Sequence, residues 1–254
     1  MVSRTDEAQK RIESRTVELR YRQSDGTFTE TTLDRLPVDE VAEGLPVRDF
    51  RSYKGRRHYS GWYYATTGER LVAYESRLEL ARILLADVDP DVVAMAAQPF
   101  QVCAPDGDRM RRHVPDLLLV HADAGVSVVD VKAPTRLQDS RTQEQFSWMR
   151  RVCSGPGWAF EAWSRADPVL LDNVRFLAGY RRRQVIDPQA LEKVAEAATE
   201  HRTIGAIEWA LTGNHPAEVV RPAVLHLVWW GHLRAELTCP LSTQTAVVPR
   251  GQAR

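Results

Sequence analysis

The sequence predicts an α/β fold in which helices flank a mixed central sheet. Two short apolar runs rich in β-branched residues, at 117–120 and 126–131, are bounded by turn residues and are typical of buried strands. After residue 75 the apolar spacing changes to that of a helix of about three turns. The predicted order is strand, strand, helix, strand, strand, strand, helix, strand, which indicates an α/β layer with a mixed sheet.

Length and charge divide the 254 residues into three predicted parts. Residues 1–44 carry seven basic and ten acidic residues, and we expect a polar N-terminal arm or extension. Residues 45–183, with twenty-one basic and seventeen acidic residues, contain the α/β layer. Residues 184–254, with six basic and seven acidic residues, form a separate C-terminal domain. The whole chain has a net charge of +0, so no global basic field indicates nucleic acid.

The N-terminal elements follow from turn residues and composition. Asp25-Gly26 marks a turn within 17–33, so a small hairpin is expected there. Residues 45–65 interleave arginine and lysine with tyrosine and tryptophan, a composition that suits phosphate contact and base stacking. A solvated strand with aromatics packed beneath it has the same composition. Residues 70–74 form the strand that leads into the first helix.

Two glutamates at the start of that helix, Glu75 and Glu79, are four residues apart and therefore lie on one face. One of them can supply a further ligand to a metal site, or both are ordinary solvent-facing residues. A basic cluster at 109–113 then precedes Asp116, where it either contacts a substrate phosphate or forms a solvated face. A second helix over 143–152 and a strand over 158–163 complete the layer.

Three polar residues stand at the ends of the two buried strands, with Asp116 opening the first and Asp130 and Lys132 closing the second. Side chains at i and i+2 of a strand share one face, so Asp130 and Lys132 lie together. The turn at 121–125 is short enough for a hairpin, with Gly125 supplying the unusual dihedral. Two carboxylates in a partly buried place repel, and one takes up a proton unless a cation keeps both ionised.

A hard divalent cation resolves this conflict, because Mg²⁺ prefers carboxylate oxygens, water and phosphate as ligands. We expect Mg²⁺ at this site, with Mn²⁺ able to substitute. Such a site hydrolyses phosphodiesters, and Lys132 positions the attacking water or neutralises developing charge. The alternative is an Asp–Lys pair on an exposed edge strand. The two runs are apolar on both faces, however, whereas an exposed strand alternates polar and apolar residues.

Residues 184–254 are expected to form three helices and a hairpin. Asp187-Pro188 supplies an N-cap followed by proline at the first helical position. Helices over 204–211 and 223–230 follow, and strands at 232–238 and 243–248 pair across a turn. This order is that of a winged-helix-like domain, which binds either DNA or protein.

The cysteine content and the distribution of charged and apolar residues indicate the cellular compartment. Three cysteines, an odd number without ligand spacing, indicate a reducing environment and argue against structural zinc. The charged residues between Arg4 and Arg15 exclude a signal-peptide core, and no apolar run is long enough to cross a bilayer. We therefore expect a cytoplasmic protein without a membrane partner.

With these residues in view, the chain resembles the TnsA-like family, the endonuclease subunit of heteromeric transposases. The resemblance covers most of residues 55–165 and extends through the C-terminal unit. Five anchors occur in order: Ser76-Arg77-Leu78-Glu79-Leu80-Ala81, Gln98-Pro99-Phe100, Pro115-Asp116-Leu117-Leu118, Val129-Asp130-Val131-Lys132 and Leu137-Gln138-Asp139-Ser140-Arg141-Thr142.

The resemblance implies a restriction-endonuclease-like core with the motif PD-(D/E)xK and a mixed central sheet. Its catalytic roles fall on Glu79, Asp116, Asp130 and Lys132, with the three acidic residues as metal ligands. Some family members have glutamine where this chain has Asp130, and an aspartate makes metal binding at that position more secure. Glu75 remains a competitor for Glu79 as the helix ligand.

The family's division of labour implies partners as well as an activity. This subunit would cleave the 5′ strands at the ends of a transposon, on double-stranded DNA, while an RNase-H-type transposase subunit processes the 3′ ends. An AAA+ regulator subunit would be a further partner. Two other functions compete with this one: a free-standing restriction or repair nuclease, and a non-catalytic DNA-binding or assembly subunit.

Overall fold

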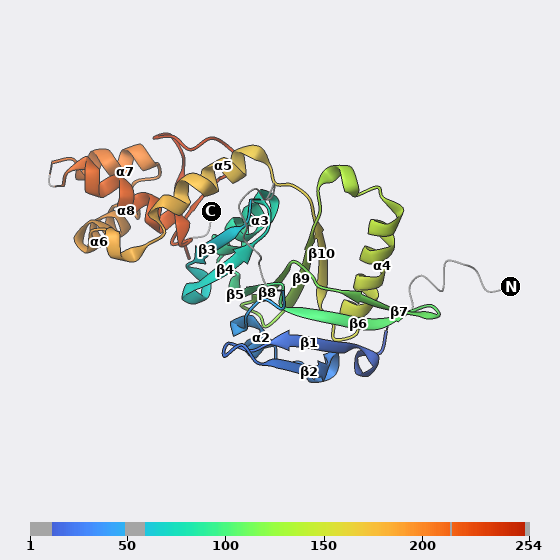
Figure 1. The fold of residues 1–254 in the computed structure, drawn as a ribbon. Helices are drawn as coiled ribbons and strands as arrows, with labels where there is room; N and C mark the ends of the chain where they lie inside the picture. The colour runs from blue at the N-terminus through green and yellow to red at the C-terminus, as the bar shows by residue number, and fades with distance from the viewer. Residues whose placement is uncertain (1–11, 49–58, 214, 252–254) are drawn as a thin grey trace. The chain divides into compact units, whose positions relative to one another are not determined.

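The chain folds as two compact units that divide between residues 165 and 166 (Figure 1). The computed structural model describes residues 12–48, 59–213 and 215–251. The first unit contains Met1–Ala86 and Asp91–Arg165, and the second contains Asp87–Pro90 and Ala166–Arg254. The division expected at 183/184 thus falls inside the second unit. The reason is helix α5 (Pro168–Leu177), which the sequence analysis missed and which packs against α8 (Ala217–Trp229).

A mixed four-stranded sheet forms the centre of the first unit, as the sequence predicts. Its strands are, in spatial order, β10 (Ala159–Trp163), β9 (Val126–Val131), β8 (Leu117–His121) and β5 (Val92–Ala97). β10 runs parallel to β9, and the other neighbours are antiparallel. Leu118 and Val128 are fully buried, because this sheet is covered on the face that carries them.

A second, antiparallel sheet joins the N-terminal hairpin to the rest of the first unit. Its spatial order is β2 (Phe28–Thr32), β1 (Glu18–Arg22), β6 (Phe100–Asp106) and β7 (Arg109–His113). Leu19 and Tyr21 alternate with exposed residues and pack in the same core as Phe100 and Trp148. The expected hairpin is therefore present, but it is part of this core rather than a separate polar arm. Residues 1–11 of the expected arm lie outside the described part.

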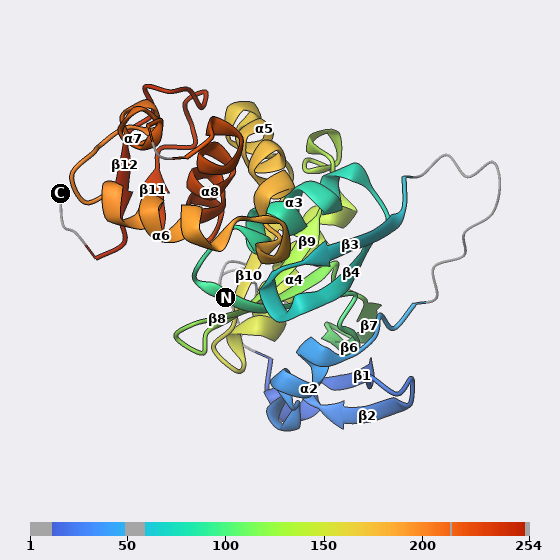
Figure 2. The ribbon, with the colours of Figure 1, turned by 90° about the vertical axis from the view of Figure 1, so that its left-hand side faces the viewer.

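Helices and a hairpin complete the first unit. Helix α4 (Ser140–Ser154) begins where Asp139 Oδ1 accepts a hydrogen bond from Arg141 N at 2.9 Å, three residues before the predicted start. Figures 1 and 2 both place the hairpin of β3 (Gly61–Ala65) and β4 (Arg70–Tyr74) beside helix α3 (Arg77–Asp87). The short elements are α2 (Val38–Glu43), η1 (Ser14–Thr16), η2 (Leu33–Arg35), η3 (Thr67–Glu69) and η4 (Pro134–Arg136).

The turn between β8 and β9 differs from the expectation in its left-handed residue. Ala124 has a φ of +64°, and Gly125 is not among the residues with positive φ. Asp123 Oδ1 accepts a hydrogen bond from Gly125 N at 2.9 Å, and a Cβ at residue 125 would lie 2.8 Å from that oxygen. A side chain at 125 would displace only the exposed Asp123 carboxylate from this hydrogen bond, and the unusual dihedral falls on the preceding alanine.

The second unit consists of helices followed by a small hairpin. After α5 come η5 (Ala178–Tyr180), η6 (Arg183–Val185), α6 (Pro188–Ala197), α7 (Ile204–Leu211) and α8, then β11 (Leu233–Ala235) paired with β12 (Val247–Pro249). All residues from Ala223 to Trp229 are buried. This C-terminal half of α8 is therefore part of the core, whereas Ala217, Glu218 and Arg221 in its N-terminal half are exposed.

Within the described ranges, no helix combines the length and the apolar character needed to cross a membrane.

We predict that acidification destabilises the second unit through His226. Its Nδ1 donates to the Tyr180 carbonyl at 2.7 Å, and burial lowers the pKa of this imidazole. Below about pH 6.5 the His226 imidazole therefore binds a proton in the unfolded chain but stays neutral in the folded chain. The free energy of unfolding falls as pH decreases below that value. The loss is at most about 1.4 kcal/mol per pH unit for one proton. Thermal unfolding at pH 7.5 and 5.5 measures it. His226→Asn, which keeps a donor but does not titrate, should show a smaller loss, and an equal loss would contradict the assignment to His226.

Candidate active site

The junction of β8 and β9 brings the two predicted aspartates together. Asp116 N donates to Val129 O at 3.0 Å, directly beyond the Leu117–Val129 pair of the antiparallel ladder. This bond departs from the register of the ladder, because residues 116 and 117 both stand against Val129, as in a β-bulge. Asp116 is still close to Asp130, since its carboxylate bonds the backbone N–H of the next residue, Val131. Lys132 follows Asp130 by two residues at the same strand end.

Asp116 is held by groups from the neighbouring strand. Its Oδ2 accepts a hydrogen bond from Val131 N at 2.6 Å and lies 3.5 Å from Lys132 Nζ. Burial raises the pKa of the Asp116 carboxyl, and the negative charge of Asp130 adds to the rise, whereas Lys132 opposes it. The structure therefore places an acid and an ammonium in contact at a position where ionisation is costly.

Asp130 has no solvent-exposed surface. His113 Nε2 lies 2.7 Å from its Oδ1 and 2.9 Å from its Oδ2, and Gln145 Nε2 donates to Oδ2 at 3.2 Å. The sequence left open whether the basic cluster that includes His113 contacts a substrate phosphate or forms a solvated face, and the His113 ring lies against Asp130. Gln145 was missed, because nothing in a single sequence indicates which residue of a helix meets a strand aspartate.

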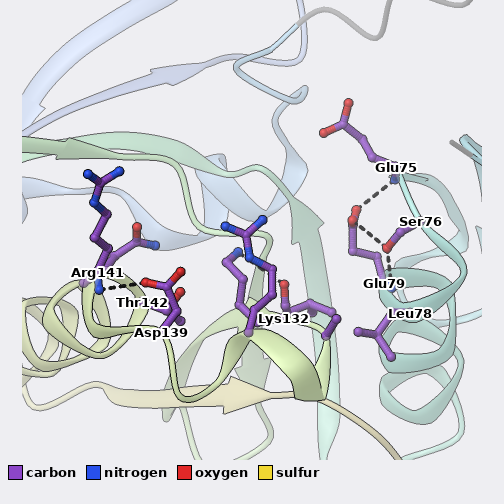
Figure 3. A pocket seen from close by; sticks show the side chains of 12 residues that line it. Glu75, Ser76, Leu78, Glu79, Lys132, Asp139, Arg141 and Thr142 are labelled. Carbon is purple, nitrogen blue, oxygen red and sulfur yellow. Dashed lines mark hydrogen bonds between the residues drawn. The ribbon is translucent and has the colours of Figure 1, made fainter. Parts of the chain in front are cut away.

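Glu79 lies at the start of α3 and takes part in capping that helix. Its carboxylate accepts hydrogen bonds from Glu75 N and from Ser76 Oγ, both at 2.8 Å (Figure 3). Ser76 Oγ in turn accepts from Glu79 N at 3.1 Å, which completes a capping box. Burial raises the pKa of Glu79, and Asp116 contributes to the rise. Glu79 is thus electrostatically coupled to Asp116, although no hydrogen bond joins them.

Glu75, the competing glutamate, is tied to the sheet by Gln98. Gln98 Nε2 donates to Glu75 Oε2 at 3.1 Å, and Gln98 N donates to Asp116 O at 2.9 Å. Gln98 is buried and adopts a φ of +45°, a conformation rare for a residue other than glycine. Gln98 thus contacts both Glu75 before α3 and Asp116 before β8, a role that its sequence position did not indicate.

A hollow of about 780 Å³ opens between the start of α3, the end of β9 and the start of α4 (Figure 3). Glu75 and Glu79 line one side, Lys132 lies in the middle, and Arg141 and Thr142 line the other. The other lining residues are Ser76, Leu78, Val131, Ala133, Arg136, Asp139 and Gln145.

Carboxylates are the type of ligand that a divalent cation requires, but their side chains are not arranged as a complete coordination site. No group of three or more His, Cys, Asp and Glu residues in the described part is arranged to hold a metal. Burial raises the pKa of both Asp116 and Glu79, and the charge of Asp130 adds to the rise at Asp116 as the charge of Asp116 does at Glu79. A hard cation relieves such repulsion, and carboxylate oxygens are the donors that Mg²⁺ prefers.

Most residues of the basic cluster before Asp116 form ion pairs or hydrogen bonds within the protein. Arg111 and Arg151 lie 2.7 and 2.8 Å from the carboxylate oxygens of Asp106, and Arg109 also pairs with that residue at 3.4 Å. These side chains fasten β6 and β7 to α4. Of the aromatic segment, Tyr59 and Trp62 are about half exposed, at 55% and 52%, whereas residues 49–58 lie outside the described part.

Comparison with known proteins identifies the segment that carries this site. Residues 89–164 match the family model described as TnsA-like endonuclease N terminal. The matched segment contains Asp116, Asp130 and Lys132 and runs from the start of β5 to the end of β10, whereas Glu75 and Glu79 precede it. No curated protein matches the chain. The resemblance inferred from the sequence is thereby confirmed for this segment.

We predict that Asp116→Asn raises the thermal stability of the metal-free protein at neutral pH. The folded state holds the Asp116 proton more tightly than the unfolded state, so stability falls as pH rises from the ordinary carboxyl range through the raised pKa. Asparagine removes this cost and keeps an oxygen for Val131 N. Thermal unfolding in the presence of a chelator measures the effect, with Asp108→Asn in the exposed β6–β7 turn as the matched control. A lower melting temperature in Asp116→Asn than in the control would show that Lys132 outweighs the burial cost.

Proposed function

We propose, from the TnsA-like endonuclease N-terminal domain in residues 89–164, that this chain is a metal-dependent DNA endonuclease subunit of a heteromeric transposase. It cleaves the 5′ strands at transposon ends by phosphodiester hydrolysis. One observation carries this proposal: Asp116 and Lys132, 3.5 Å apart, and the adjacent buried Asp130 all lie inside the matched segment.

The residues have distinct roles in this proposal. Asp116 and Asp130 hold Mg²⁺, for which Mn²⁺ substitutes, together with a glutamate from the start of α3. A divalent ion held there would supply Lewis-acid chemistry to the phosphodiester and to the attacking water. Lys132 contributes a positive charge where negative charge develops on the phosphate oxygens. Glu79 is the helix glutamate that we prefer, because its pKa responds to Asp116.

DNA reaches this site along a surface with unpaired arginines. A second hollow, of about 580 Å³, is lined by residues of β7 and α4 and shares Arg141 and Gln145 with the first. Among the described residues, Arg112, Arg136 and Arg141 line these two hollows without an ion pair to an acidic side chain. Arg109 and Arg111, in contrast, pair with Asp106 and Glu144. Arginine forks suit phosphates, so the three unpaired side chains are available to the DNA backbone.

We assign the second unit to assembly with the partner subunits. Its helices and hairpin follow the order expected of a winged helix, but the C-terminal half of α8, from Ala223 to Trp229, is buried in the core. Trp209 of α7 and Phe176 of α5 are instead exposed, at 80% and 50%. Exposed aromatic residues are frequent at protein interfaces, which suits contact with an RNase-H-type transposase subunit or an AAA+ regulator.

We predict that Lys132→Ala lowers the rate of 5′-strand cleavage by about 10²–10³, with DNA affinity almost unchanged and only a small loss of stability from the lost contact with Asp116. Asp130→Ala should lose cleavage and weaken the Mg²⁺ response as well, since a metal ligand is removed. The assay is cleavage of transposon-end DNA with the partner transposase present, over a Mg²⁺ titration. Lys193→Ala, whose lysine pairs with Glu196 in the second unit, is the matched control.

Wild-type cleavage by Asp130→Ala would refute the nuclease assignment. Equal cleavage with and without the partner transposase would favour a free-standing nuclease over a transposase subunit.

We also predict that Arg136→Gln and Arg141→Gln weaken DNA binding by removing phosphate contacts. Each lost contact should reduce the slope of log affinity against log salt by about 0.9, equally for unrelated DNA sequences. Binding of the uncleaving Asp116→Asn protein to duplex DNA at several salt concentrations measures the slope. Arg35→Gln, an exposed arginine that lines neither hollow, is the control. A slope identical to that of the control would place the DNA elsewhere.

A further inference from the structure

The carboxylate of Asp130 is fully buried and held by two side chains from other elements. His113 is the last residue of β7, and its Nε2 approaches both carboxylate oxygens at 2.7 and 2.9 Å. Gln145 lies in the second turn of α4, and its Nε2 donates to Oδ2 at 3.2 Å and lies within 3.2 Å of both ring nitrogens of His113. The three side chains therefore form one contact network.

The direction of these hydrogen bonds follows from the chemistry of the groups. An ionised carboxylate only accepts, so the hydrogen of His113 is on Nε2, and the amide nitrogen of Gln145 donates. A carboxylate offers about four lone-pair positions. Oδ2 accepts from both partners, whereas Oδ1 accepts from His113 alone. One acceptor position on Oδ1 is therefore left for a further ligand.

The two partners are fixed by the packing of the first unit. On α4, Phe146 and Met149 follow Gln145 by one and four residues and are buried. Trp148 Nε1 donates to Pro105 O at 3.0 Å, which fastens α4 to β6. The Asp106 carboxylate joins Arg111 of β7 to Arg151 of α4. A side chain mounted on such elements holds its partner in one geometry, as metal ligands require.

We propose that His113 and Gln145 are positioning residues that hold Asp130 with its remaining Oδ1 acceptor turned to a divalent cation. This inference rests on the proposed function, because it assigns Asp130 to the metal. A purely structural role would be to compensate a buried negative charge, and its loss would lower stability without a specific effect on metal affinity.

The test measures metal affinity and stability separately, on the full chain. Mn²⁺ binding by calorimetry and thermal unfolding are compared for Gln145→Ala and for Gln143→Ala, a matched control in the same helix whose side chain donates to Leu137 O. We expect Gln145→Ala to bind Mn²⁺ about 10–100-fold more weakly, as for other partners of metal ligands, while the control binds as the wild type does. Asp130→Asn, measured alongside, reports the loss of the ligand itself.

The role of His113 is tested by two variants, one that keeps a hydrogen-bond donor and one that removes it. His113→Gln places an amide donor near the position of Nε2 and should retain Mn²⁺ binding, whereas His113→Leu should lose it. If the leucine variant does not fold, Gln145→Ala still tests the inference.

The outcomes separate this inference from the proposed function. Wild-type Mn²⁺ affinity in Gln145→Ala, when Asp130→Asn binds weakly, would overturn the positioning role alone. Wild-type affinity in Asp130→Asn would overturn the metal assignment, and this inference with it.

Discussion

The first unit depends on placing two carboxylates side by side at the junction of β8 and β9. Their burial is costly, because a charge removed from water must be compensated by nearby donors or cations. The surroundings supply that compensation piece by piece: Val131 N and Lys132 for Asp116, and His113 and Gln145 for Asp130. These groups come from the end of β9, from β7 of the second sheet and from α4, so the three elements meet at one small polar centre.

Much of the central sheet was predictable because its signals are local. The apolar runs of β8 and β9 lack the alternation of an exposed strand, and a short turn between them fixes their antiparallel register. Adjacent strand ends therefore predict that Asp116, Asp130 and Lys132 are close, although the backbone bond from Asp116 N to Val129 O departs from the regular register. The N-terminal hairpin was also visible, but its incorporation into the core was not, because the pairing of β1 with β6 joins residues about eighty positions apart.

The partners within the site were not predictable from a single sequence. The motif of Ser76 and Glu79 was available as a capping box, and it explains why the Glu79 carboxylate lies over its own helix start. Gln145 carries no such signal, since its importance arises from the crossing of α4 over β9. The basic cluster shows the opposite limitation: its composition suggested phosphate binding, yet Arg111 belongs to an ion-pair network around Asp106. Composition cannot distinguish an arginine that faces a ligand from one that fastens two strands.

The pairing of β1 with β6 has a consequence for how the protein is made on the ribosome. Strand β1 ends at Arg22, but its partner β6 begins only at Phe100, and α4, which packs on the same core, ends at Ser154. At about 5–20 residues per second, a ribosome takes roughly 4–16 s to synthesise the intervening segment. During that interval one edge of the nascent hairpin has no neighbour to accept its backbone hydrogen bonds. The acidic excess of residues 1–44 gives the waiting hairpin like charges that repel other copies, which protects it from premature association on the polysome.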